Sequence, residues 1–230
     1  MISLNELWLL IPLLLATGVV AGVLAGLLGV GGGIVIVPML YHLFIAFDID
    51  SALAMPLAVG TSLSTIILTS LVSARSPYAK GGVDMALVKG WVLPVLLGGR
   101  VGAAGPAIVD GNQVRSVFGV MLVVVSVHML ASSYRPLQLL DHLPARPVQV
   151  VLAVVVGALS ALLGIGGGTL MVPLLTLLAF PIHRAVSTAS VFGLIISLPA
   201  TFMYVGTGWD APGLPPLSTG YVNWATFAIL

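Results

Sequence analysis

The chain has 230 residues, of which 59% are hydrophobic and only 7% are charged. About a quarter of the residues in an ordinary soluble domain are charged, so this composition excludes a soluble globular fold. A net charge of +1 without any basic run excludes a nucleic-acid-binding surface. The chain has no cysteine, which excludes a disulfide framework and thiolate metal ligands.

Apolar segments follow one another along the chain, and most are long enough for membrane spans. A helix needs about 20 apolar residues to cross a hydrocarbon core of about 30 Å. Hydropathy predicts segments at about 7–28, 34–47, 52–74, 83–109, 114–131, 148–163, 169–180, 185–205 and from 221 onward. We therefore expect an all-α, polytopic transmembrane helix bundle, with its first segment retained as a span and not cleaved as a signal peptide.

The distribution of Lys and Arg predicts which side of the membrane each loop faces, because cytoplasmic loops are enriched in both. The loops predicted to be cytoplasmic hold Arg75, Lys80, Arg135, Arg146 and Arg184. The opposite loops hold Asp48, Asp50, Asp110, Asp210 and one cation, Arg115. We expect a multi-pass protein of the plasma membrane, the bacterial inner membrane, with its N-terminus outside.

Two stretches of the sequence are copies of each other. Residues 22–40 read GVLAGLLGVGGGIVIVPML and residues 157–175 read GALSALLGIGGGTLMVPLL, at an offset of 135. A weaker match continues from Gly60 to Gly193 and from Ser64 to Ser197. A repeat of this kind indicates duplication. The first copy holds five segments before the central loop, so the second enters the membrane from the opposite side.

This inverted internal repeat is a common plan of secondary transporters. We predict a first transmembrane repeat at 1–132, a cytoplasmic linker at 133–147 and a second transmembrane repeat at 148–230. The sequence stops at Leu230, inside the fourth segment of the second copy. We therefore expect the second repeat to be truncated at its C-terminus.

The glycine pentads GVGGG at 29–33 and GIGGG at 164–168 interrupt apolar stretches and precede segments too short to span a bilayer. We predict two glycine-broken short helices whose N-termini point into the protein, where N–H groups and the helix dipole favour an anion. The predicted substrate site comprises Gly29, Gly31, Gly32, Gly33, Gly164, Gly166, Gly167 and Gly168. The alternative is that the glycines only allow helices to pack closely.

Five polar side chains within the apolar segments are further candidates for substrate binding. The hydroxyls of Thr61, Ser62, Thr188 and Ser190 could bind an oxyanion, or could bond a carbonyl one turn back in their own helix. Arg100 lies in the apolar segment 83–109, where an ionisable group is a functional candidate. The alternative is that its guanidinium extends to the membrane surface.

The paired GxGGG…P stretches, the short loops and the Ala/Thr/Ser-rich segments 51–65 and 184–197 resemble the sulfite exporter TauE/SafE family. The resemblance implies a plasma-membrane carrier of sulfite, sulfonates or related small anions. Family members usually run longer at the C-terminus than this chain does.

From these patterns we expect a secondary transporter that moves a small anion, a sulfur oxyanion such as sulfite or an organosulfonate, across the lipid bilayer by alternating access. Coupling to a proton or another ion fits this function, and no metal or cofactor is implied. A passive anion channel or an assembly subunit are alternatives. We expect no enzyme, because the sequence has no HExxH, GxSxG or cysteine. The sequence does not indicate an oligomeric state.

Overall fold

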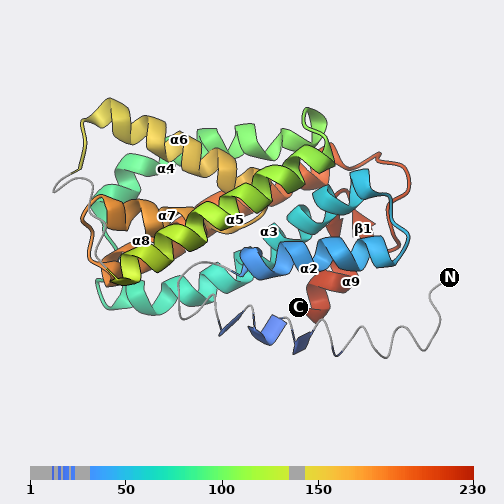
Figure 1. Ribbon diagram of the computed structural model, residues 1–230, viewed down its shortest axis with the longest axis horizontal. Coiled ribbons are helices and arrows are strands. Elements are labelled where there is room, and N and C mark those ends of the chain that lie inside the picture. The colour runs from blue at the N-terminus through green and yellow to red at the C-terminus, as the bar shows by residue number, and fades with distance from the viewer. Residues whose placement is uncertain (1–11, 13–14, 17, 21, 24–31, 135–142) are drawn as a thin grey trace.

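The computed structural model describes residues 12, 15, 16, 18–20, 22, 23, 32–134 and 143–230, and these form a bundle of long helices (Figure 1). The helices are α2 (Gly33–Ala46), α3 (Ser51–Ala79), α4 (Met85–Ala103), α5 (Gly111–Tyr134), α6 (Arg146–Leu163), α7 (Gly166–Leu177), α8 (Ile182–Thr207) and α9 (Trp224–Ile229). In the described part of the chain, five helices, α3, α4, α5, α6 and α8, are long and apolar enough to cross a membrane. The predicted all-α polytopic bundle is confirmed. Most of the predicted segment 7–28 lies outside the described residues.

The two short helices predicted from the glycine pentads are present as α2 and α7, with 14 and 12 residues. At 1.5 Å per residue they rise about 20 Å, which is less than the thickness of a hydrocarbon core. Helix α6 ends at Leu163, and Gly164 and Gly166 then take φ values of 67° and 65°. Glycine adopts these left-handed values at little cost, so the chain reverses there within two residues.

Two regions differ from the predicted segments. The predicted segment 83–109 is not one helix, because α4 ends at Ala103 and a 3-10 turn, η1 (Gly105–Ala107), follows. This turn contains Pro106, which lacks the N–H that would continue the α-helix. The region after α8 holds a small antiparallel hairpin of β1 (Ser218–Thr219) and β2 (Val222–Asn223), which the sequence analysis did not predict.

Small residues let α4 and α6 pack backbone to backbone. Gly98 and Gly102 of α4 lie against the carbonyls of Val154 and Ala158 in α6, and Gly157 of α6 lies against the carbonyl of Val95. A Cβ at any of these glycines would overlap backbone atoms of the other helix. Close helix packing through small residues is therefore the role of these glycines, which are distinct from the pentads.

The α4–α6 contact predicts a stability difference between two glycines of the same helix. Gly102→Leu forces a side chain into the α6 backbone and is expected to lower the free energy of unfolding by about 1–3 kcal/mol. Gly90→Leu is the matched control, because nothing lies within 4 Å of a Cβ at that position. Thermal unfolding of both purified variants in detergent measures the difference in their stability. Equal stability of the two variants would contradict this description of the interface.

Candidate functional site

The first residue of α2 lies against the break between α6 and α7. A Cβ on Gly33 would lie 2.5 Å from the Cα of Ile165 and would overlap the carbonyl oxygen of Gly164. Gly33, the last residue of the first predicted glycine segment, therefore meets the second segment backbone to backbone, although Gly33 and Gly164 are 131 residues apart in the chain. Gly32 is buried beside this contact as the N-cap of α2. Gly29 and Gly31 lie outside the described residues.

Helix α3 covers one side of the break. The hydroxyl of Ser62 donates a hydrogen bond of 2.8 Å to the carbonyl of Gly164, and both groups are buried. A Cβ on Gly164 would lie 2.9 Å from the Cα of Val59, and one on Gly166 would lie 3.0 Å from Cγ2 of Ile66. The predicted residue Ser62 is thus brought to the glycine segment, where it satisfies a carbonyl that no helix uses.

Helix α8 covers another side of the same break. A Cβ on Gly167 would lie 2.8 Å from the carbonyl carbon of Phe192 and 3.0 Å from the nitrogen of Gly193. Further along α8, the hydroxyl of Tyr204 donates to the carbonyl of Leu162 at 3.3 Å. The buried glycines 166–168 therefore form the first turn of a helix that is enclosed by the bundle. Backbone of this kind is tolerated at membrane depth only inside protein.

Thr61 and Thr188 make equivalent contacts in the two halves of the chain. The N–H of Asn223, the N-cap of α9, donates to the hydroxyl of Thr61 at 3.0 Å. The N–H of Asp84, the N-cap of α4, donates to the hydroxyl of Thr188 at 3.0 Å. Each threonine thus joins a long helix of one half to a helix start of the other. Ser190, by contrast, donates to the carbonyl of Ser187 in its own helix.

These reciprocal contacts correct the register of the weaker repeat. Gly60 lies against the carbonyl of Tyr221, and in the same way a Cβ on Gly82 would lie 3.1 Å from Oγ of Ser187. Gly60 therefore corresponds to Ser187, and the predicted pairing of Gly60 with Gly193 is wrong. The strings AVGT at 58–61 and AVST at 185–188 carry the signal that would have found this register.

The structure does not bring Arg100 to the glycine segments. Arg100 lies in the last turn of α4 and is exposed on the surface of the bundle. Gly98 and Gly102 contact α6, so Arg100, at about 160–200° around the helix from them, points away from this interface. The placement agrees with a guanidinium that extends along the surface.

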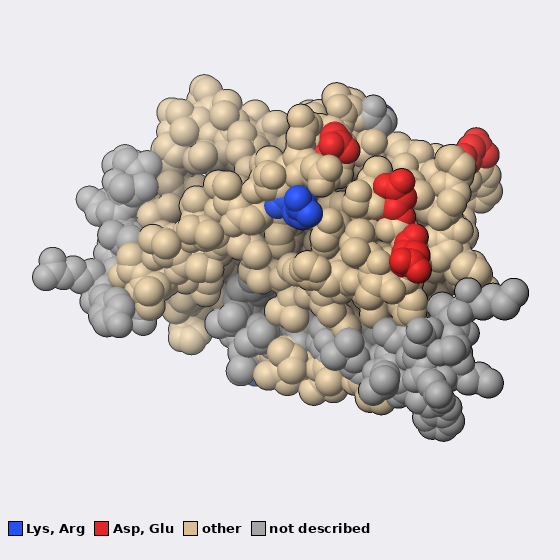
Figure 2. Space-filling model, turned by 45° about the vertical axis from the view of Figure 1, so that its right-hand side comes forward, with Lys and Arg blue, Asp and Glu red and all other residues tan. Residues whose placement is uncertain are grey.

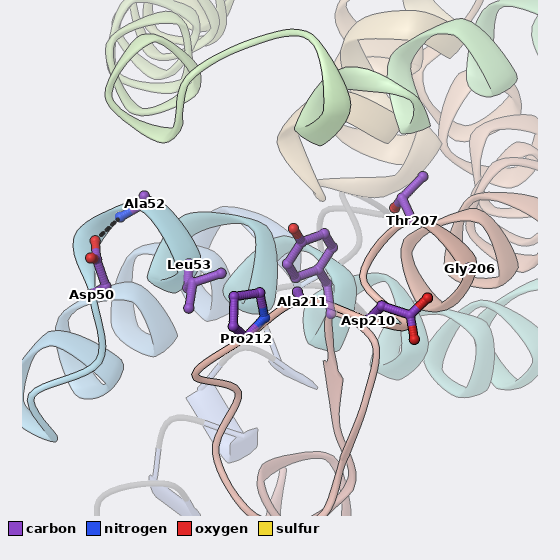
Figure 3. A pocket seen from close by; sticks show the side chains of 9 residues that line it. Asp50, Ala52, Leu53, Gly206, Thr207, Asp210, Ala211 and Pro212 are labelled. Atoms are coloured by element: carbon purple, nitrogen blue, oxygen red, sulfur yellow. Dashed lines mark hydrogen bonds between the residues drawn. The ribbon is translucent and has the colours of Figure 1, made fainter.

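The two ends of the bundle differ in charge and in closure. At the end where α4 and α8 begin, Arg184 forms an ion pair of 2.8 Å with Asp84, whose side chain is 17% exposed. Figure 2 shows a face on which acidic residues gather, with a cation to one side of them. At the opposite end of the bundle, where α3 begins and α8 ends, a pocket of about 520 Å³ opens (Figure 3); it is lined by Asp50, Ala52, Leu53, Gly206, Thr207, Asp210, Ala211, Pro212 and Tyr221.

Two tyrosines that the sequence analysis missed connect this pocket to the break. Tyr221 lines the pocket, and its ring meets that of Tyr204 edge to face with centroids 6.5 Å apart. Tyr204 in turn reaches the last turn of α6 through the carbonyl of Leu162. No sequence pattern marked either residue, because their importance comes from the hairpin that places Tyr221. Among the described residues, no group of three or more His, Asp or Glu could hold a metal ion.

Comparison with known proteins gives one family and several relatives. The family described as "Sulfite exporter TauE/SafE" matches residues 14–230. A "Probable membrane transporter protein" of Haemophilus influenzae is 30% identical over 216 residues, which cover 92% of this chain and 80% of the relative. A probable membrane transporter protein of Methanocaldococcus jannaschii is 30% identical over 203 residues, with 85% and 75% coverage. "Probable membrane transporter protein YunE" of Bacillus subtilis is 30% identical over 230 residues, with 92% and 80% coverage. No solved structure matches this chain.

The reciprocal threonine contacts predict a loss of stability when either hydroxyl is removed. Thr61→Val and Thr188→Val each leave a helix-capping N–H without its acceptor, which is expected to cost about 1–3 kcal/mol. Thr207→Val is the control, because its exposed hydroxyl only donates to Met203 in its own helix. Melting temperatures of the purified variants in detergent test this, and values unchanged from the parent protein would contradict it.

Proposed function

Because the chain belongs to the sulfite exporter TauE/SafE family and is an integral, multi-pass membrane transporter, we propose that it carries a small anion by alternating access. We propose a sulfur oxyanion, such as sulfite or an organosulfonate, as its substrate and the plasma membrane as its location. The observation that carries this proposal is the contact between Gly33 and Gly164–Ile165, which places the starts of two short helices together inside the bundle.

The chemistry of this contact favours a negative charge. A helix N-terminus carries about half a positive charge and presents N–H groups that its own helix does not use. Helices α2 and α7 begin at Gly33 and Gly166, and Gly33 packs against Gly164 and Ile165, the two residues before α7. Two such termini in a medium of low dielectric constant attract an anion more strongly than either would in water.

Alternating access requires two units that move against each other, and the predicted repeats 1–132 and 148–230 are those units in this proposal. The Thr61–Asn223 and Thr188–Asp84 hydrogen bonds support it, because each joins one repeat to the other in the same way. The Asp84–Arg184 ion pair joins them again at one end, while the pocket opens at the other. Access to the break in this state is thus from the pocket end, and coupling to a proton or another ion would drive the exchange of states.

Substitutions at the break test the site. Gly33→Leu and Gly167→Leu place a side chain into the facing backbone, and both are expected to abolish transport while membrane insertion is retained. Gly119→Leu is the control, because a Cβ there meets nothing within 4 Å. The measurement is uptake of labelled sulfite and an organosulfonate into proteoliposomes that contain equal amounts of each variant, checked for monodispersity before reconstitution.

Flux in the same vesicles distinguishes a carrier from a passive channel. A carrier gives saturable uptake that is accelerated by the same anion on the other side of the membrane, whereas a channel gives no such acceleration. Full transport by both glycine variants would exclude the break as the binding site. Uptake that does not saturate, and that is not accelerated by the same anion on the other side of the membrane, would exclude alternating access.

A further inference from the structure

A single ion pair joins the two proposed units at the end of the bundle away from the pocket. Arg184, in the first turn of α8, donates to the carboxylate of Asp84 at 2.8 Å, and no other ion pair links residues that the structure describes. Asp84 belongs to the unit 1–132 and Arg184 to the unit 148–230 of the proposed transporter. The contact therefore crosses the boundary at which alternating access requires movement.

The carboxylate of Asp84 has two roles, and they can be separated. One of its oxygens accepts the N–H of Leu87 at 3.0 Å and so caps the start of α4, while the other accepts from Arg184. Asparagine caps helices about as well as aspartate does, because its side-chain oxygen accepts the same N–H. Replacing Asp84 by asparagine thus removes the ion pair and keeps the cap.

The segment before α4 packs tightly on α8 beside this ion pair. A Cβ on Gly82 would lie 3.1 Å from Oγ of Ser187, so the backbone and the helix are already in close contact. On α8 itself, Ala185 and Ala189 are completely buried. A path from this end to the interior therefore requires the segment 82–84 to lift from α8.

The equivalent positions at the pocket end carry no charge. In the register set by the two threonine contacts, Leu57 is the counterpart of Arg184. Asn223 is likewise the counterpart of Asp84. Leu57 is completely buried, and the side chain of Asn223 accepts the N–H of Thr226 as a helix cap. The chain itself therefore shows that asparagine can cap a helix at this position of the repeat without an ion pair.

The ion pair differs from the contact at the pocket end in its response to salt. The side chain of Arg184 is 56% exposed, so dissolved ions reach the pair and screen it. The corresponding contact at the pocket end is a buried hydrogen bond between neutral groups, in which the N–H of Asn223 donates to Thr61. Salt therefore weakens the contact at one end of the bundle and not the contact at the other.

The exposure of the pair also sets the size of its effect. A partly exposed ion pair changes an equilibrium between two states by about two- to fivefold. A contact of this strength biases the exchange of the two states without preventing it. Alternating access requires both states to be visited, so a weak contact suits this position better than a buried ion pair, whose loss is strongly unfavourable.

We infer that the Asp84–Arg184 ion pair is an electrostatic latch that favours the state open at the pocket end. When the pair forms, the segment 82–84 stays closed over α8, and when it is lost, the population shifts toward the state open at the opposite end. This inference rests on the proposed alternating access and adds to it the contact that sets the balance between the two states.

The accessibility of single cysteines measures this balance, and the chain has no cysteine of its own. Ala189 and Ala200 are both buried in α8, each seven residues from an end of the helix. Ala189→Cys therefore reports on the ion-pair end and Ala200→Cys on the pocket end. The full chain is placed in proteoliposomes with a water-soluble maleimide on both sides of the membrane, and the labelling rate of each reporter is measured.

Asp84→Asn is expected to raise the labelling rate of Ala189→Cys about two- to fivefold, while the rate of Ala200→Cys does not rise. Arg184→Gln is expected to act in the same way. Arg75→Gln is the control, because that exposed cation makes no ion pair with a described residue. Salt at about 1 M, where the Debye length is about 3 Å, is expected to raise the labelling of Ala189→Cys only when Asp84 is present.

Hydrogen exchange gives the same comparison without a reporter cysteine. Backbone amides of residues 182–190 are expected to exchange faster in Asp84→Asn than in the parent protein, whereas those of residues 200–207 are not. The melting temperature in detergent is expected to change little, because the cap of α4 is retained.

The outcomes separate this inference from the proposed function. Equal labelling and equal exchange at the ion-pair end of Asp84→Asn and the parent protein overturn the latch and leave anion transport intact. Faster labelling of both reporters shows a general loosening of the bundle and also overturns it. The proposed function fails on a different result, which is the absence of saturable anion uptake by the parent protein.

Discussion

A lipid bilayer offers no hydrogen bonds, and this constraint governs the whole structure. Helices that break in mid-membrane persist only where protein covers the freed backbone. Here the start of α2 covers part of the break before α7, because Gly33 lies against the carbonyl of Gly164 and the adjoining Cα of Ile165. A side chain at position 33 would separate the two segments, so the contact accounts for glycine there.

The second consequence is that the halves of the chain depend on each other. The N-cap N–H of α4 uses a threonine of α8, and that of α9 uses a threonine of α3. The two caps differ in one respect: Asp84 also pairs with Arg184, whereas the side chain of Asn223 bonds within its own hairpin. The two threonine contacts are equivalent, but the two ends of the bundle differ: an ion pair joins the helices at one end, and a pocket opens at the other.

Features that depend on local sequence patterns, such as membrane spans and helix breaks, were predictable from the sequence. Hydropathy located the spans that the structure describes beyond residue 32, and the glycine pentads located both short helices, because lipid imposes these patterns on every residue. Arg100 was different. A cationic residue inside an apolar segment was predicted to bind substrate, but only the packing of Gly98 and Gly102 against α6 shows which way its side chain points. The direction of one side chain depends on contacts between helices, which hydropathy does not contain.

The same reasoning explains why three buried, unpartnered hydroxyls could not be found from the sequence. Ser160, Ser197 and Thr201 are of the same residue types as the hydroxyls that bond their own helices, so no motif sets them apart. They differ only because the fold buries them without a partner. The cations that the sequence offered lie at the surface, and Arg115, at the acidic end, already donates to the hydroxyl of Tyr41. Every described Lys and Arg lies at the surface and the described interior holds hydroxyls, so the bundle avoids the cost of burying a permanent cation in a medium of low dielectric constant.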